Sequence, residues 1–304
     1  MTELSRKIFS DYQVRRKKEQ KTRFIEFMQK NIPSITVEEG GVPKSRNLIV
    51  GDVANAKVIF TAHYDTCAAM PFPNLIMPKN ILLSILPILA GFVAVTAALY
   101  VLAYLITDDL FISYDISTFV SLLLLLSLIT LGRPNKNNAN DNTSGVITLV
   151  ELMDRLSEQE KEKVAFVFFD HEENGMIGSS FFEKQHRRDL LDKLIINFDC
   201  VSDGDNIMLI QSKKARNKYE KILKETFLPT HDKNIFIEKA LRAIYPSDQM
   251  TFENSIAVAA LKKSKIGLYM DRIHTKKDVI FDESNIEYIC SGMKNFLSRI
   301  LNER

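Results

Sequence analysis

The sequence predicts an α/β fold: a mostly parallel, mixed sheet covered by helices on both faces, with an inserted transmembrane helical hairpin. Strand-like runs alternate with helical patterns along the chain, which favours a mostly parallel sheet. Two of the runs, VAFVFFD and LIINFD, are almost continuously apolar. Such runs are typical of central strands buried on both faces. The third observation is an abrupt change of composition over residues 81–131.

The expected elements follow one another in order, and a polar loop over 133–143 leads from the hairpin back into the globular part. The expected strands are 47–50, 57–62, 164–170, 194–199, 207–210 and 257–261. The expected helices are 5–30, 144–157, 176–187, 214–227, 248–254 and 284–302.

Residues 81–131 contain two runs without a charged residue. The first, 81–106, has 26 residues, more than the roughly 20 that a helix needs to cross a bilayer. The second, 116–131, has 16, which is short but workable if the bilayer thins locally. Soluble cores rarely need 26 uncharged residues in a row. We therefore expect a transmembrane hairpin rather than a pair of buried core helices.

The charges that flank the hairpin predict its orientation. Lys79 precedes the first run, and Arg133 and Lys136 follow the second, whereas the connecting loop carries acidic residues only. Positive residues stay on the cytoplasmic side of a membrane. We therefore expect a two-span membrane protein whose globular domain, residues 1–80 and 133–304, faces the cytoplasm, with the inserted hairpin at 81–131.

Composition narrows the expected partners. The formal net charge of +2 is nearly neutral, so no nucleic-acid partner is expected. Residues 1–30 carry nine Lys/Arg against four Asp/Glu, which predicts a basic N-terminal helix. Such a helix either lies on an anionic membrane surface or is an ordinary solvated face. The three cysteines form no CxxC pair, which fits a reducing compartment.

Five short segments carry metal-ligand residue types, and each lies at or just after an expected strand end, where open α/β sheets place their sites. In HYD, His63 and Asp65 point the same way, so the carboxylate can accept the second N–H of a metal-bound imidazole. Asp141 in NDNTSG precedes a helix, where Asp is also a common N-cap. Adjacent Glu172 and Glu173 repel each other and need a cation or a proton. The other two segments, NFDC and RIHTKKD, contain Asp199 and His274.

In order, the segments read HxD, DNxSG, EExGxxGS, a strand-terminal Asp and IHTxxD. This ordered set resembles the co-catalytic dizinc aminopeptidases, the group of aminopeptidase Y, aminopeptidase S and the glutamate carboxypeptidases. The segment YPSDQMTFENSIAVAAL also resembles that family's SDHxxFxxxGIPA stretch. The resemblance covers residues 40–66 and 133–302. It implies a zinc exopeptidase, most simply an aminopeptidase that removes N-terminal residues from peptides by a metal-activated water. Together with the expected hairpin, this predicts a membrane-anchored enzyme.

The resemblance also implies roles for single residues. Two zinc or similar divalent ions would share an activated water. Glu172 would be the general base that takes the proton of this water and passes it to the leaving amine. The implied zinc ligands are His63 and Asp199 for one ion, Glu173 and His274 for the other, and Asp141 as the bridge, while Asp65 would orient His63 and Tyr245 would be either an oxyanion donor or a buried structural tyrosine.

The chain departs from the family in two places. Gln249 stands where a histidine is common, and the hairpin separates His63 from Asp141, where most relatives have a short link. Three alternatives stay open: a glutaminyl cyclase-like enzyme with one zinc, a carboxypeptidase or N-acyl amino acid deacylase, and a catalytically inactive binding relative. A peptide substrate and the lipid bilayer are the expected partners, and the sequence predicts no oligomeric state.

Overall fold

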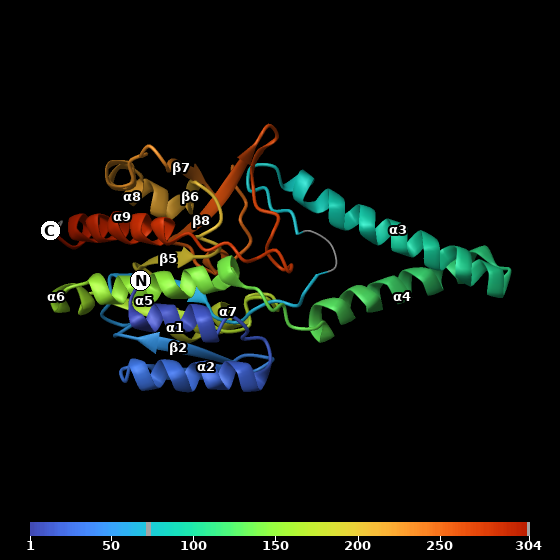
Figure 1. Ribbon diagram of the computed structural model, residues 1–304, viewed down its shortest axis with the longest axis horizontal. Helices are drawn as coiled ribbons and strands as arrows, with labels where there is room; N and C mark the ends of the chain where they lie inside the picture. The colour runs from blue at the N-terminus through green and yellow to red at the C-terminus, as the bar shows by residue number, and fades with distance from the viewer. Residues whose placement is uncertain (71–73, 303–304) are drawn as a thin grey trace.

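The computed structural model describes residues 1–70 and 74–302 (Figure 1). Its strands form one mixed sheet in the order β1-β2-β4-β3-β5-β8-β6-β7, with β9 beside β8. The central strands β4, β3, β5 and β8 run parallel to one another, and β6 is antiparallel to β8. The strands are β1 (Thr36–Gly40), β2 (Ser45–Val50), β3 (Val58–His63), β4 (Val164–Phe169), β5 (Leu194–Phe198), β6 (Asn206–Gln211), β7 (Asn234–Lys239), β8 (Ser255–Ser264) and β9 (Gly267–Tyr269).

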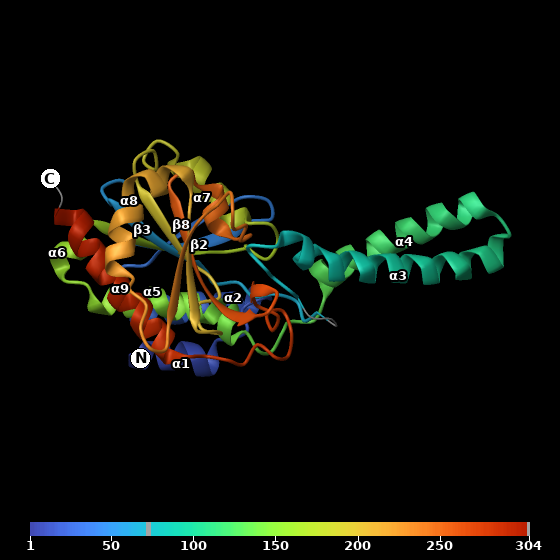
Figure 2. The same ribbon diagram turned by 90° about the horizontal axis from the view of Figure 1, so that it is seen from above.

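Helices cover both faces of this sheet, as the sequence predicts (Figures 1 and 2). Neighbouring residues of a strand point to opposite faces, so Phe60 packs in one core cluster and Ile59 in the other. The helices and helical turns are α1 (Glu3–Asp11), α2 (Lys18–Asn31), α3 (Ile81–Thr107), α4 (Leu110–Leu131), η1 (Ala139–Ser144), α5 (Gly145–Arg155), α6 (Glu158–Lys161), α7 (Ile177–His186), α8 (Lys213–Thr226), η2 (Asp248–Thr251) and α9 (Glu283–Asn302).

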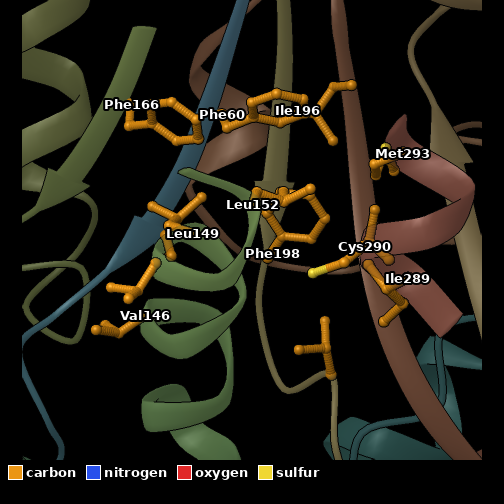
Figure 3. Close-up of a cluster of buried hydrophobic side chains, with 14 of the residues drawn as sticks. Phe60, Val146, Leu149, Leu152, Phe166, Ile196, Phe198, Ile289, Cys290 and Met293 are labelled. Carbon is orange, nitrogen blue, oxygen red and sulfur yellow. The ribbon is translucent and has the colours of Figure 1, made fainter. Parts of the chain in front are cut away.

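The larger core cluster joins the sheet to α5 and α9 (Figure 3). Phe60 of β3 packs against Phe166 of β4 and Phe198 of β5, with ring centroids 5.6 and 5.9 Å apart. Leu149 and Met293 face these rings from α5 and α9, and all five side chains are buried. This packing fixes the central parallel strands, whose carboxyl ends carry the polar segments.

The predicted single helix over 5–30 is wrong. The chain leaves the helical conformation after α1 and re-enters it at α2, and Arg15 lies between them. The guanidinium of Arg15 is fully buried and donates to the main-chain oxygens of Tyr12 and Tyr64 and to Oγ1 of Thr143. The helix breaks because Arg15 reaches inward, so the basic residues of this segment do not form one continuous exposed face. The expected helix over 248–254 is likewise only the short turn η2.

Helices α3 and α4 lie side by side and project from one end of the sheet, away from the C-terminal end of α9 (Figures 1 and 2). Both are long and apolar enough to cross a membrane. Only 6% and 17% of their most apolar 18-residue stretches are buried in the structure. Such exposure contradicts the alternative of two buried core helices. Thr96 of α3 donates a hydrogen bond of 2.9 Å to Ser121 of α4, one polar contact that joins the pair.

Candidate metal centre and active site

The candidate site lies at the carboxyl ends of three adjacent parallel strands. His63 is the last residue of β3 and pairs with Phe169, the last residue of β4. Glu172 and Glu173 follow β4 by three and four residues, and Asp199 follows β5 directly. The parallel register brings these chain ends together at one edge of the sheet. The turn η1 and the loop before α9 add Asp141 and His274.

Asp141 lies between the two histidines. Its Oδ1 is 3.3 Å from Nε2 of His63, and its Oδ2 is 2.9 Å from Nε2 of His274. Nε2 of His63 is also 3.6 Å from Oδ1 of Asp199, and Nε2 of His274 is 3.2 Å from Oε2 of Glu173. The ligand-type atoms form three overlapping groups. Two of them share Asp141, one around each histidine, and the third joins His63 to Glu172 and Glu173.

The cluster concentrates negative charge in a buried place. Burial and the neighbouring carboxylates raise the pKa of Glu172 well above its usual value and that of Glu173 to about 8. Burial would lower the pKa of His274, but Glu173 and Asp141 outweigh it and raise that pKa to about 9. Carboxylates this close need a compensating cation.

Two further observations test whether the site fits metal ions. Oε1 of Glu173 and Oδ1 of Asp199 are buried and have no hydrogen-bond partner among the described residues. An unpartnered buried carboxylate oxygen costs free energy unless a cation binds it. The imidazole and carboxylate donors of the two groups are those that zinc uses in proteins. The residues therefore fit zinc.

The turn that carries Asp141 is held from two sides. Both carboxylate oxygens of Asp278 accept main-chain N–H groups, from Asn140 at 2.8 Å and from Asp141 at 3.1 Å. The side-chain amide of Asn142 donates to the main-chain oxygen of Phe198 at 2.9 Å. A Cβ on Gly145 would lie 2.3 Å from that same oxygen, so α5 starts closer to β5 than any other residue type allows. These contacts place Asp141 between the histidines.

Asp65 holds two parts of the site. Nδ1 of His63 lies 3.1 Å from the main-chain oxygen of Asp65 and 3.6 Å from its carboxylate, so the main chain is the nearer partner of the imidazole. The carboxylate of Asp65 accepts the main-chain N–H groups of Glu172 at 3.0 Å and Glu173 at 3.3 Å. Sequence reasoning anticipated the proximity to His63 but not the contact with the glutamate turn.

A cavity of about 300 Å³ adjoins this cluster, and the carboxylates of Asp141, Glu172, Glu173 and Asp199 line it. Tyr245 also lines the cavity, and its hydroxyl donates to the main-chain oxygen of Asp199 at 3.1 Å. The structure thus brings together all eight residues that the sequence predicts for the site: His63, Asp65, Asp141, Glu172, Glu173, Asp199, Tyr245 and His274.

Sequence reasoning missed three residues at this centre. Asp248 is buried with both carboxylate oxygens unpartnered among the described residues, and burial raises its pKa to about 7. Sγ of Cys67 lies near the ligand-type atoms of Asp141, Glu173 and His274. Arg15 supports the chain at Tyr64 from behind. The SDQ segment was a signal for Asp248, whereas Cys67 and Arg15 belong to no motif.

The family model of peptidase family M28 matches residues 127–289, more than half of the chain. The chain belongs to peptidase family M28. It is therefore a zinc metallopeptidase, a hydrolase whose family implies a peptide substrate. This match confirms the resemblance to the dizinc aminopeptidases, and the chain with its two apolar helices has the mixed α/β architecture of this family.

Solved structures show the same fold at low sequence identity. The LapA aminopeptidase of Legionella pneumophila is 10% identical with a TM-score of 0.59, covering 99% of this chain and 70% of that one. The glutaminyl cyclase of Porphyromonas gingivalis is 13% identical with a TM-score of 0.59, covering 98% and 96%. A Zn-dependent exopeptidase from Parabacteroides distasonis is 13% identical with a TM-score of 0.56, covering 99% and 96%. No curated protein matches the sequence.

Proposed function

We propose that this peptidase is an aminopeptidase that binds two zinc ions in a domain anchored to a membrane by the α3–α4 hairpin. The observation that carries the two-ion proposal is the position of Asp141, whose two oxygens face different histidines. His63 and Asp199 would hold one ion, Glu173 and His274 the other, and Asp141 both. A glutaminyl cyclase-like enzyme with one zinc would not need both His63 and Asp199 as ligands.

The protein groups around the cavity have separate roles in this proposal. When bound, the two zinc ions would lower the pKa of a water molecule and polarise the scissile carbonyl. Glu172 lines the cavity beside the ligand atoms, where it can accept the proton of the attacking water and pass it to the leaving amine. Asp65 keeps Glu172 in place through its main-chain N–H. Tyr245 would turn its hydroxyl from the oxygen of Asp199 towards the developing oxyanion.

Charge in the cavity favours the amino end of a peptide as the substrate. Four carboxylates line the cavity, and no Lys or Arg of the described chain does. Three of these carboxylates would be zinc ligands, so the two ions would offset much of their charge. An α-carboxylate, however, would find no cationic side chain among the described residues that line this cavity. Arg16 and Lys17 line a separate hollow of about 730 Å³ beside Glu173 on the α4 side. Carboxypeptidase substrates therefore belong in the same test.

The anchoring part of the proposal concerns the hairpin. Helix α3 has 27 residues and α4 has 22, and their apolar stretches are exposed. The positive residues Lys79 and Arg133 flank the hairpin, which favours a domain on the cytoplasmic side. Leu131 is only ten positions before Asp141, and an extended chain covers at most about 3.6 Å per residue. The site therefore works within roughly 35 Å of the bilayer edge, where membrane-associated peptides are concentrated.

One experiment tests the activity and the metal count together. The full-length protein is purified in detergent, loaded with zinc and subjected to elemental analysis. It is then assayed with aminoacyl amides, amino-blocked peptides, carboxypeptidase substrates and glutaminyl peptides. We expect two zinc ions per chain and hydrolysis of the aminoacyl amides. One zinc per chain with cyclisation of glutaminyl peptides would contradict the proposal, as would cleavage from the carboxyl end alone.

A further inference from the structure

The cavity beside the carboxylates is shared between the peptidase domain and the foot of the hairpin. One end is formed by the acidic cluster. The same cavity is lined by Ile81, Ser84, Ile85 and Ile88 of α3, which we call the α3 wall, together with the preceding Ile76. The inserted hairpin therefore touches the space in which a substrate would lie.

The α3 wall is one stripe of the helix. Its positions follow the spacing i, i+3, i+4 and i+7, which places four side chains on the same face. The side of α3 turned away from the cavity carries Leu82, Leu86 and Leu89, which are 76%, 58% and 53% exposed, against 49% and 41% for Ile85 and Ile88 of the α3 wall. Of these two sets, only the α3 wall lines the cavity.

The foot of α3 is fixed to the peptidase domain. The hydroxyl of Ser84 accepts the main-chain N–H of Met77 at 2.8 Å, and this bond is buried. Ile76 and Met270 exchange two main-chain hydrogen bonds of 2.9 Å. The side-chain amide of Asn74 lies 3.3 Å from Nδ1 of His274. The α3 wall therefore keeps a defined position relative to the candidate metal centre.

Helix α3 is long enough to cross a membrane and still leave its first two turns to line the cavity. The helix has 27 residues, and a span needs only about 20. Residues 89–107 still fall within the range of about 17–25 residues for a span, so the first two turns, including Ile88, can stay with the domain. A cavity of about 300 Å³ is at the small end of the ligand-pocket range of about 300–1,000 Å³. It suits one aliphatic side chain beside the reacting group.

We propose that the α3 wall is the specificity pocket of this peptidase, and that it selects an aliphatic residue of about leucine size on the amino side of the cleaved bond. This inference rests on the proposed aminopeptidase function. An acidic side chain is disfavoured, because the isoleucines of the α3 wall offer a carboxylate no positive or hydrogen-bonding partner. An alanine leaves apolar surface of Ile85 and Ile88 uncovered. In this proposal the hairpin determines which side chain the enzyme accepts as well as where the active site lies relative to the membrane.

The test uses Ile85→Phe, which fills the pocket, with Leu86→Phe on the side of α3 turned away from the cavity as the matched control. In wild type, kcat/KM for leucine amide should exceed that for alanine amide by at least about tenfold, the usual scale for missing apolar contacts. Ile85→Phe should lower leucine-amide hydrolysis by about tenfold or more and leave alanine-amide hydrolysis within about threefold. Leu86→Phe should keep the wild-type ratio. Zinc content and melting temperature report the integrity of each variant.

Two results would overturn the pocket proposal. One is an equal loss of kcat/KM on leucine amide and alanine amide in Ile85→Phe, and the other is the same change of the leucine-to-alanine ratio in Leu86→Phe. If Ile85→Phe does not fold, Ile85→Ala replaces it. This variant should raise kcat/KM for phenylalanine amide relative to kcat/KM for leucine amide. Should wild type hydrolyse no aminoacyl amide, the aminopeptidase proposal fails. The pocket proposal is then tested separately, by calorimetric measurement of the binding of leucine hydroxamate and alanine hydroxamate to the zinc-loaded protein. A preference for the leucine compound that Ile85→Phe removes supports it, and equal affinities in wild type refute it.

Discussion

At the scale of single residues, the two adjacent glutamates differ in their surroundings. Oε2 of Glu173 lies 3.2 Å from Nε2 of His274, in the group that would hold one ion. The carboxylate of Glu172 lies within 4.8 Å of His63 and Glu173, but among the described contacts it forms no ion pair with an imidazole. We expect Glu172→Gln to keep two zinc ions and lower turnover by about 100-fold or more, the scale of general acid–base catalysis. Glu173→Gln should lose one ion. Elemental analysis and kcat on an aminoacyl amide measure both effects.

The matched control for these variants is Glu162→Gln, because Glu162 is exposed and precedes β4, at the opposite end of that strand from Glu172. It should behave as wild type in both measurements. Near-normal turnover in Glu172→Gln would show that another group takes the proton. Two ions retained in Glu173→Gln would show that Glu173 is not a ligand.

Gly145 offers a second prediction at this scale. A Cβ there would lie 2.3 Å from the main-chain oxygen of Phe198 and 2.4 Å from Oδ1 of Asn142, so α5 must move away from β5. We expect Gly145→Ala to destabilise the protein by about 1–3 kcal/mol, as overpacked sites do, and to weaken zinc binding because Asp141 shifts with the turn. Denaturant unfolding and zinc titration measure this. Gly91→Ala is the control, since its Cβ would meet nothing within 4 Å.

His63, Glu173 and Asp199 were predictable from sequence because each one ends or follows a strand, whereas Asp141 and His274 were found from the order of the motifs. Arg15 and Cys67 could not be found in this way, because their positions depend on how the first 70 residues fold back onto η1 and the loop after β4. A residue whose contacts are all distant in sequence leaves no local pattern.

At the scale of elements, the central strands were predicted and the outer ones were missed. β4 and β5 are buried along their whole length, so their sequences are apolar runs. The outer strands β1 and β7 are only partly buried, and their sequences TVEEG and NIFIEK mix charged and apolar residues. The predicted single N-terminal helix failed for a different reason, because one buried cation, Arg15, outweighs the helical pattern around it.

The hairpin gives the prediction that belongs to this scale. Leu110, at the start of α4, is 60% exposed, and Lys136, after the hairpin, is exposed as well. The native cysteines Cys67, Cys200 and Cys290 are buried, so background labelling should be low. We expect Leu110→Cys to react with an impermeant thiol reagent on intact cells and Lys136→Cys to react only after the cells are opened. The reverse pattern would refute the proposed orientation, and release of the protein by carbonate alone would refute the span.

At the scale of the whole molecule, we propose two functions for the hairpin, and a simple deletion would remove both at once. The segment before α3 and the first two turns of α3 line the cavity, whereas the distal parts of α3 and α4 project away from the domain (Figures 1 and 2). Removing residues 75–132 would therefore take away the pocket wall together with the anchor. A cut that starts beyond Ile88 separates the two.

We therefore predict different results for two replacements by a flexible Gly/Ser linker. Replacing residues 92–124 keeps the α3 wall and removes the proposed span. This variant should lose membrane attachment, cleave soluble leucine amide at the wild-type rate, and cleave peptides held on lipid vesicles more slowly. Replacing residues 75–132 should also abolish the preference for leucine over alanine. Flotation with vesicles, together with kcat/KM on the two amides and on a vesicle-bound peptide, measures all three properties.

If the shorter replacement cleaved soluble and vesicle-bound peptides with the wild-type ratio, the hairpin would not concentrate the site on membrane substrates. If it lost the leucine preference, the distal helices rather than the α3 wall would set specificity.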